Sequence, residues 1–277
     1  MSEAMLTWID THVHWDAAEF DQDRDAALVR AKLAGVTHCL NPSVSVSGVS
    51  QIQALAEASH SRNDWPTLLP AYGIHPLYID QIQPDDLQRL DAQLRGHRPF
   101  AIGEIGLDAY AGAPDFAKQQ RVFEAQLHLA ATYQLPVLLH VRHAVEAVIQ
   151  TLKRVQRSGQ KIPGGIAHAF NGSAVQAQQL IDMGFLLGFG GGCTYEGSTR
   201  IRALAAQLPL TAIVLETDAP DMSPVWLHGQ RNESNQLPLV AKTVAALRQI
   251  SLTALSEATT GNVARLLGRL TNGASAR

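Results

Sequence analysis

Cysteine and aromatic residues are scarce in this chain. Its 277 residues contain two cysteines, Cys39 and Cys193, and 6% aromatic residues. Two distant cysteines form neither a disulfide framework nor a zinc-knuckle spacing, so we expect free thiols in a reducing compartment. With few aromatic residues, aliphatic side chains must build most of the core. The apolar share of 46% is that of a globular protein with a substantial core.

Excess positive charge and long apolar runs are also lacking. The formal net charge is −3 and the sequence pI is 6.4, which argues against a broad basic face for long nucleic acid but leaves room for a small positive site. No apolar run approaches the ~20 residues needed to cross a bilayer. Residues 1–5 show no basic region leading into an apolar core, as a secretory signal would. We therefore expect a cytoplasmic protein with no membrane contact and no obligate protein partner.

Strand-like runs alternate with helix-patterned stretches, which indicates a parallel sheet with crossover connections. At this length we expect a single-domain (β/α)₈ TIM barrel over residues 1–277, with an open doubly wound sheet as the alternative. The expected strands lie near residues 6–10, 36–41, 68–73, 100–104, 137–140, 165–168, 185–190 and 213–216. The expected helices lie near residues 49–60, 85–95, 115–133, 144–157, 173–183, 198–208, 238–249 and 253–267.

Six potential metal ligands fall at or just after the ends of these strands. His12 and His14 are two residues apart, so on an extended chain both imidazoles project from one face. Two nitrogens do not complete a metal site, so further ligands must come from other strands. In a (β/α)₈ barrel the carboxyl ends of the strands meet at one rim. The sequence therefore predicts that one metal centre includes His12, His14, Glu104, His140, His168 and Asp218.

Six motifs surround these candidate ligands. They are Asp-Thr-His-Val-His-Trp-Asp at 10–16, Gly-Ile-His-Pro at 73–76, Ala-Ile-Gly-Glu-Ile-Gly-Leu-Asp at 101–108, Leu-Pro-Val-Leu-Leu-His at 135–140, His-Ala-Phe-Asn-Gly-Ser at 168–173 and Leu-Glu-Thr-Asp-Ala-Pro at 215–220. In this order they resemble the TatD family of metal-dependent hydrolases, which are usually described as deoxyribonucleases on amidohydrolase-like barrels. The resemblance covers about residues 9–268, essentially the whole chain. Residues 216–222 and 229–232 look closest to the YjjV branch of that family.

The resemblance implies two divalent ions, Mg²⁺, Mn²⁺ or Zn²⁺, bridged by Glu104. His12, His14 and Asp218 would complete the first site, and His140 and His168 the second. A water activated by this dinuclear centre would attack a phosphoester bond, with Glu104 and Asp218 as the catalytic carboxylates. Three further residues are candidates for holding the substrate phosphate: His75, Arg142 and Arg231.

The expected activity is therefore hydrolysis of phosphoester bonds, as in a TatD-type deoxyribonuclease with 3'-5' exonuclease character. The weak net charge favours DNA ends or small phosphoester substrates over long duplex. The same centre could instead polarise a carbonyl group and serve a metal-dependent esterase, lactonase or amidohydrolase. A metal-stabilised binding protein is the non-enzymatic alternative, but such a protein has no need of a bridging carboxylate.

Overall fold

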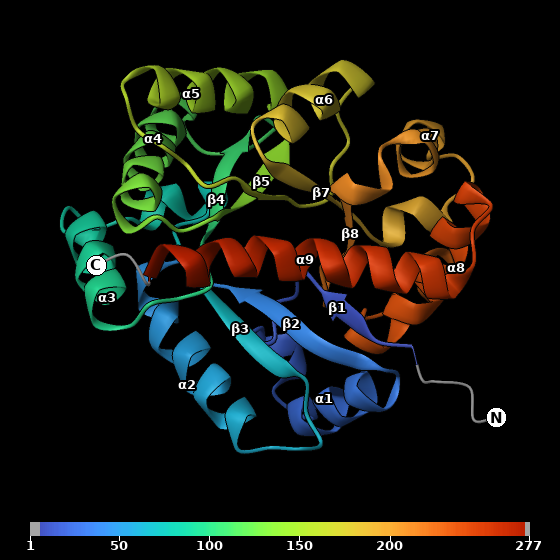
Figure 1. The fold of residues 1–277 in the computed structure, drawn as a ribbon. Coiled ribbons are helices and arrows are strands. Elements are labelled where there is room, and N and C mark those ends of the chain that lie inside the picture. Colours follow the sequence, from blue (N-terminus) through green and yellow to red (C-terminus); the bar gives the residue numbers. More distant parts are fainter. Residues whose placement is uncertain (1–5, 275–277) are drawn as a thin grey trace.

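Eight parallel strands form the centre of the computed structural model, which describes residues 6–274, and they are hydrogen-bonded in sequence order from β1 to β8. Helices surround them, as Figure 1 shows. The predicted (β/α)₈ barrel is confirmed. The strands are β1 (Trp8–Asp10), β2 (Val36–Pro42), β3 (Thr67–Tyr72), β4 (Ala101–Asp108), β5 (Val137–Arg142), β6 (Gly165–Ala167), β7 (Phe185–Phe189) and β8 (Ile213–Leu215).

The helices bury one apolar stripe each against the sheet or against a neighbouring helix. In α5, for example, Val148, Leu152 and Val155 are buried at intervals of three and four residues. No helix within residues 6–274 is long and apolar enough to cross a membrane. The α-helices are α1 (Arg24–Leu33), α2 (Val49–His60), α3 (Asp86–Gly96), α4 (Phe116–Tyr133), α5 (Val145–Arg157), α6 (Ala174–Asp182), α7 (Thr199–Gln207), α8 (Leu237–Arg248) and α9 (Leu252–Ala274).

Helix α1 ends just before Gly35, where the sequence indicates the end of a helical stretch without giving its bounds. Its buried residues are Ala27, Leu28 and Ala31, two of which are alanines. Alanine has high helix propensity but contributes little to a hydrophobic pattern, so this short stripe gives a weak signal. The other helices lie where the hydrophobic pattern placed them, with ends that differ by a few residues at most, except that α9 extends beyond the expected end at residue 267.

Hydrogen bonds between the first and last strands bring the two ends of the sheet together. The backbone N–H of Thr11 donates to the carbonyl of Leu215 at 3.1 Å. The Asp10 carboxylate accepts from the backbone N–H and the hydroxyl of Thr217, at 2.9 and 2.6 Å. Asp10 is fully buried, and burial raises its pKa to about 6. These bonds hold the segment after β1 against the segment after β8.

Helix α9 covers the amino ends of the strands and crosses in front of the barrel in Figure 1. The side-chain amide of Asn262 donates to the carbonyl of Ile213 at 2.7 Å, and the Ser256 hydroxyl donates to the carbonyl of Thr7 at 2.6 Å. Val263 joins a small apolar cluster with residues from several strands. Since this end of the barrel is closed by a helix, the site must lie at the carboxyl ends.

Strand β4 is longer than the sequence predicts and runs four residues past Glu104 to Asp108. Its pairing with β5 is irregular between Ile102 and Ile105. A side chain at Gly106 would meet the carbonyl oxygen of His140 at 2.0 Å, so only glycine allows this approach. Strand β4 therefore continues on both sides of Glu104, and this residue does not lie in the loop after the strand.

Candidate metal centre

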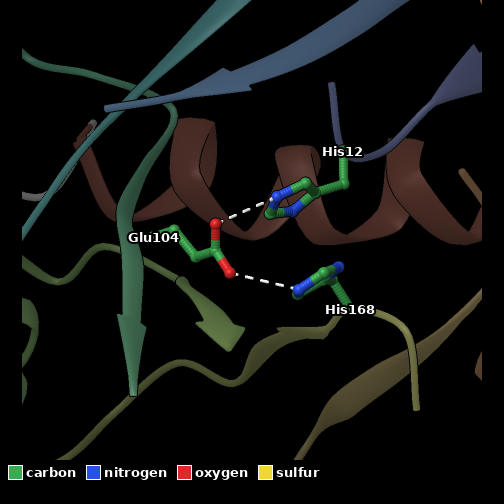
Figure 2. A group of neighbouring side chains, drawn as sticks. All are labelled: His12, Glu104 and His168. Atoms are coloured by element: carbon green, nitrogen blue, oxygen red, sulfur yellow. Dashed lines mark hydrogen bonds and ion pairs between the residues drawn. The ribbon is translucent and has the colours of Figure 1, made fainter. Parts of the chain in front are cut away.

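Glu104 lies at the centre of a group of imidazoles at the carboxyl ends of the strands. Its side chain is buried, with 2% exposed. Figure 2 shows its two carboxylate oxygens directed at different imidazoles: Oε2 lies 3.1 Å from Nε2 of His12, and Oε1 lies 3.1 Å from Nε2 of His168. Each carboxylate oxygen carries its own lone pairs, so this one side chain can contact two groups of ligands.

The first group consists of His12, His14 and Asp218, from the segments that follow β1 and β8. Nε2 of His12 lies 3.2 Å from Nε2 of His14 and 3.5 Å from Oδ1 of Asp218. Val13 forms a bridge with Ala219, so the chain here is extended and the two histidines share one face. Asp218 has a φ of 58°, a left-handed conformation that non-glycine residues adopt mainly at constrained, often functional, positions.

The second group surrounds Oε1 of Glu104 and consists of His140, His168 and His75. Nδ1 of His140 lies 2.8 Å from this oxygen, and Nε2 of His75 lies 3.3 Å from it. His75 and His140 approach each other at 3.0 Å between ring nitrogens. The sequence suggested His75 as a phosphate contact, but the structure places it among the potential ligands. We call His75 and the six predicted ligands the ligand cluster.

Asp108 holds His140 from the side opposite Glu104. Oδ2 of Asp108 lies 3.0 Å from Nε2 of His140, and Asp108 is fully buried. The other carboxylate oxygen, Oδ1, accepts a hydrogen bond from the backbone N–H of Tyr110 at 2.8 Å. If Nε2 of His140 donates to Asp108, its Nδ1 keeps a lone pair for the Glu104 side. Carboxylates that orient ligating histidines in this way are common beside protein metal sites.

Glu216 is a second buried carboxylate beside the ligand cluster, and the sequence did not single it out. Oε1 accepts a hydrogen bond from the backbone N–H of Ala169 at 2.5 Å and lies 3.8 Å from Nδ1 of His168. Burial raises the pKa of Glu216 to about 8. Within residues 6–274, neither Oε2 of Glu216 nor Nδ1 of His168 has a hydrogen-bond partner. The available sequence signals were its place in the Leu-Glu-Thr-Asp-Ala-Pro motif and at the end of the expected strand 213–216.

Burial and neighbouring charges shift the pKa values of several groups in the ligand cluster. Burial lowers the pKa of His12 well below its ordinary value. Burial also opposes protonation of His14 and His168, but the nearby Glu104 and Asp218 carboxylates outweigh it and raise these pKa values to about 9 and about 10. In return, and against its burial, the surrounding imidazoles hold the pKa of Glu104 well below its usual range.

The donor set fits divalent cations. Ligand atoms within each of three triads of the cluster lie within 4.8 Å of one another. Atoms bound at about 2.0–2.2 Å to one tetrahedral ion would lie roughly 3.3–3.6 Å apart, close to the separations seen here. Imidazole nitrogens favour Zn²⁺ or Mn²⁺, whereas Mg²⁺ prefers oxygen. The five imidazoles and two carboxylates of the ligand cluster are therefore suited to a transition-type divalent ion.

A cavity of about 1150 Å³ lies over the ligand cluster. This exceeds the roughly 300–1,000 Å³ of pockets for drug-sized ligands. Arg142 and Arg200 line the cavity, and in the part of the chain that the structure describes neither forms an ion pair with a carboxylate. Nε of Arg200 donates to Oδ1 of Asn171 at 3.0 Å. The predicted phosphate contact Arg142 thus reaches the cavity, and Arg200 was missed because nothing in its helical segment marks it.

Arg231 lies away from this cavity, although the sequence suggested it as a substrate contact. Its guanidinium donates to both carboxylate oxygens of Asp23, at 2.6 and 2.9 Å, and to Glu233 at 2.5 Å. It also stacks over the Phe20 ring, 4.6 Å from the centroid. Because these partners occupy its donors, Arg231 joins the start of α1 to the loop after β8. Its contact with a substrate phosphate stays a prediction from the sequence, and the geometry does not support it.

Arg231→Met should lower the free energy of unfolding by about 1 kcal/mol at neutral pH and leave KM unchanged. Hydrogen bonds from Arg231 and Arg30 hold the pKa of Asp23 below its ordinary value. Such stabilisation is present above the unfolded pKa, about 4, and is lost as the pH falls through the folded pKa. Urea unfolding should therefore show that the difference in the free energy of unfolding between the variant and wild type decreases as the pH is lowered. An increased KM with unchanged stability would instead indicate that Arg231 contacts the substrate.

Comparison with known proteins identifies the family. The chain matches the family described as TatD related DNase over residues 9–268. The uncharacterized metal-dependent hydrolase YjjV of Escherichia coli K12 is 35% identical over 92% of this chain and 95% of its own. The crystal structure of YjjV, a TatD homologue, has a TM-score of 0.87 at 34% identity, covering 95% of this chain and 98% of that one.

A second relative carries a more specific name. The 3'-5' ssDNA/RNA exonuclease TatD of Klebsiella pneumoniae (strain 342) is 32% identical, over 95% of this chain and 99% of its own. These matches confirm the family predicted from the motifs, and they extend over almost the whole barrel. The chain belongs to the TatD family of metal-dependent hydrolases.

Proposed function

We propose that the protein hydrolyses phosphodiester bonds at the ends of single-stranded nucleic acid, using two divalent ions. The position of Glu104 carries this proposal, because its two oxygens face two separate groups of nitrogen and oxygen ligands. His12, His14 and Asp218 would hold one ion with Glu104, and His140 and His168 would hold the other. Bound ions would stabilise charge on the attacked phosphoryl group and make water a stronger nucleophile.

The remaining residues provide positioning and proton transfer. Asp218 is 15% exposed and lines the cavity, so one of its oxygens can accept a proton from the attacking water. Arg142 and Arg200 have no carboxylate partner among the described residues and can donate to phosphate oxygens of the substrate. With a net charge of −3, the protein offers no broad positively charged surface that would bind a duplex. Strand ends and short fragments therefore fit this cavity best.

The test uses metal-free protein reconstituted separately with Mn²⁺, Zn²⁺ and Mg²⁺. We expect metal-dependent shortening of single-stranded DNA or RNA from the 3' end, with slower cleavage of duplex. The panel also includes nucleoside monophosphates and lactones, because a carbonyl substrate could use the same ions. Lactone turnover without metal-dependent phosphodiester cleavage would overturn the proposal. Native metal content, measured on protein purified without added metal, identifies the ions.

A further inference from the structure

Tyr110, Arg142 and His143 form a group of side chains where β4 and β5 end, and we call it the stacking cluster. The Arg142 guanidinium carbon lies 3.8 Å from the centroid of the Tyr110 ring. The His143 ring lies 5.5 Å from the same ring, at an angle of 41°. Arg142 and His143 line the cavity over the ligand cluster. The stacking cluster is therefore continuous with the candidate metal centre.

The surfaces of these side chains remain available to a ligand. Tyr110 is 49% exposed although its ring is large and apolar. Arg142 and His143 are also exposed, and within residues 6–274 the Arg142 guanidinium has neither an ion pair nor a hydrogen bond. A planar cation that lies on an aromatic ring is held flat, with its other face and its N–H edges free. Such a surface is suited to a planar ring that carries negative charge nearby.

Short covalent and hydrogen-bonded links fix the stacking cluster relative to the metal ligands. Asp108 contacts Nε2 of His140 through Oδ2 and holds the backbone N–H of Tyr110 through Oδ1. Arg142 follows His140 by two residues on β5, so both side chains lie on one face of that strand. The backbone N–H of Ala109 donates to the carbonyl of Arg142 at 2.9 Å, which joins the two strand ends.

His143 adopts a strained backbone conformation beside this surface. Its φ is 55°, in the left-handed region that residues other than glycine seldom occupy. Strained residues persist where the surrounding structure holds them, and they are frequent at ligand sites. Here the conformation places an imidazole beside the Tyr110 ring at the cavity wall.

From these contacts we infer that the stacking cluster binds a nucleobase of single-stranded nucleic acid whose terminal phosphodiester lies at the ligand cluster. The inference rests on the proposed function for the bond that is cut. A phosphate alone would need the guanidinium but no exposed tyrosine ring, whereas a nucleotide offers both a planar base and a charge. Paired bases are stacked within a duplex and unavailable, so the site selects single strands.

Tyr110→Ala tests this inference, with Tyr110→Phe as the matched control that keeps the ring. One oligonucleotide carries all its bases, and a second of equal length has no bases at its 3' end. Kd is measured by fluorescence anisotropy in EDTA, and KM with Mn²⁺-loaded protein. We expect wild type and Tyr110→Phe to favour the base-containing strand about tenfold, and Tyr110→Ala to lose this preference. Arg142→Lys, which keeps the charge but loses the plane, should also reduce it.

The outcomes separate this inference from the proposed function. Equal preference in wild type and Tyr110→Ala would overturn the stacking cluster as a base site, even if phosphodiester bonds are cleaved. The same holds if Tyr110→Ala weakens both strands alike, because the lost contact would then not be with a base. Base-dependent binding without any cleavage would support the stacking cluster and refute the proposed nuclease activity.

Discussion

Glu104→Gln should reduce kcat on a single-stranded substrate on the order of 10³-fold, equivalent to about 4 kcal/mol of transition-state stabilisation. Glutamine has nearly the shape of glutamate but offers one oxygen in place of two and no negative charge. It therefore cannot bind two cations, and one side of the ligand cluster loses a ligand. We expect calorimetry or elemental analysis to find at most one tightly bound ion in the variant and two in wild type.

Glu146→Gln is the matched control for this substitution. Glu146 lines the same cavity, but it is exposed and hydrogen-bonds to Gln150 and Gln176, away from the imidazoles. Its replacement should leave metal content and kcat close to those of wild type. Two bound ions and normal turnover in Glu104→Gln would show that Glu104 does not bridge a dinuclear centre.

The positions of the predicted ligands followed from strand order more than from any single motif. His12, His168 and Asp218 come just after β1, β6 and β8, and parallel strands present their carboxyl ends at one rim. The sequence placed Glu104 at a strand end, whereas β4 continues to Asp108. That difference arises from an irregular pairing with β5, which depends on contacts between strands and has no local sequence signal.

Other parts of the site depend on residues that are far apart in the chain. Arg231 donates a hydrogen bond to Asp23, which lies 208 positions earlier in the sequence. Because of this pairing, the guanidinium contacts the start of α1 and does not line the cavity. The role of His75 was similarly hidden, because a Gly-Ile-His-Pro turn does not reveal how far its imidazole reaches toward Glu104. Charge and residue type suggested both side chains as phosphate contacts, but only the distances in the structure show their partners: Glu104 for His75, and Asp23 with Glu233 for Arg231.

Glu216 shows the same limit for a buried charge. The sequence places it as the last residue of the expected strand 213–216, and a polar residue at a strand end often belongs to a loop or a helix cap. Its burial depends on Gly188 of β7, where a Cβ atom would lie 2.0 Å from Oε2. Only the packing of two neighbouring strands leaves room for a carboxylate behind His168. A buried carboxylate held this close to an imidazole is suited to orient it.

Glu216→Gln should weaken metal binding by about 10–100-fold while leaving the fold intact. Burial raises the pKa of Glu216 to about 8, but a cation bound at the ligand cluster would favour its ionised form. That carboxylate would favour an N–H on Nδ1 of His168 and so leave Nε2, the nitrogen that faces Glu104, as the metal donor. Glutamine keeps the hydrogen bond from Ala169 but cannot take up this charge. Titration calorimetry with Zn²⁺ or Mn²⁺ measures the affinity, and thermal unfolding of the metal-free protein at neutral pH should show no decrease in stability, because a neutral amide then replaces a largely neutral acid.

Gly188→Ala provides an independent route to the same test. The added methyl group occupies the space of Oε2 and should displace Glu216, with a similar loss of metal affinity and an added loss of stability from overpacking. Glu216→Asp keeps the charge but shortens the side chain, so we expect an intermediate affinity. Unchanged affinity in Glu216→Gln, together with unchanged affinity in Gly188→Ala, would mean that His168 is oriented by the barrel alone and that Glu216 has no part in metal binding.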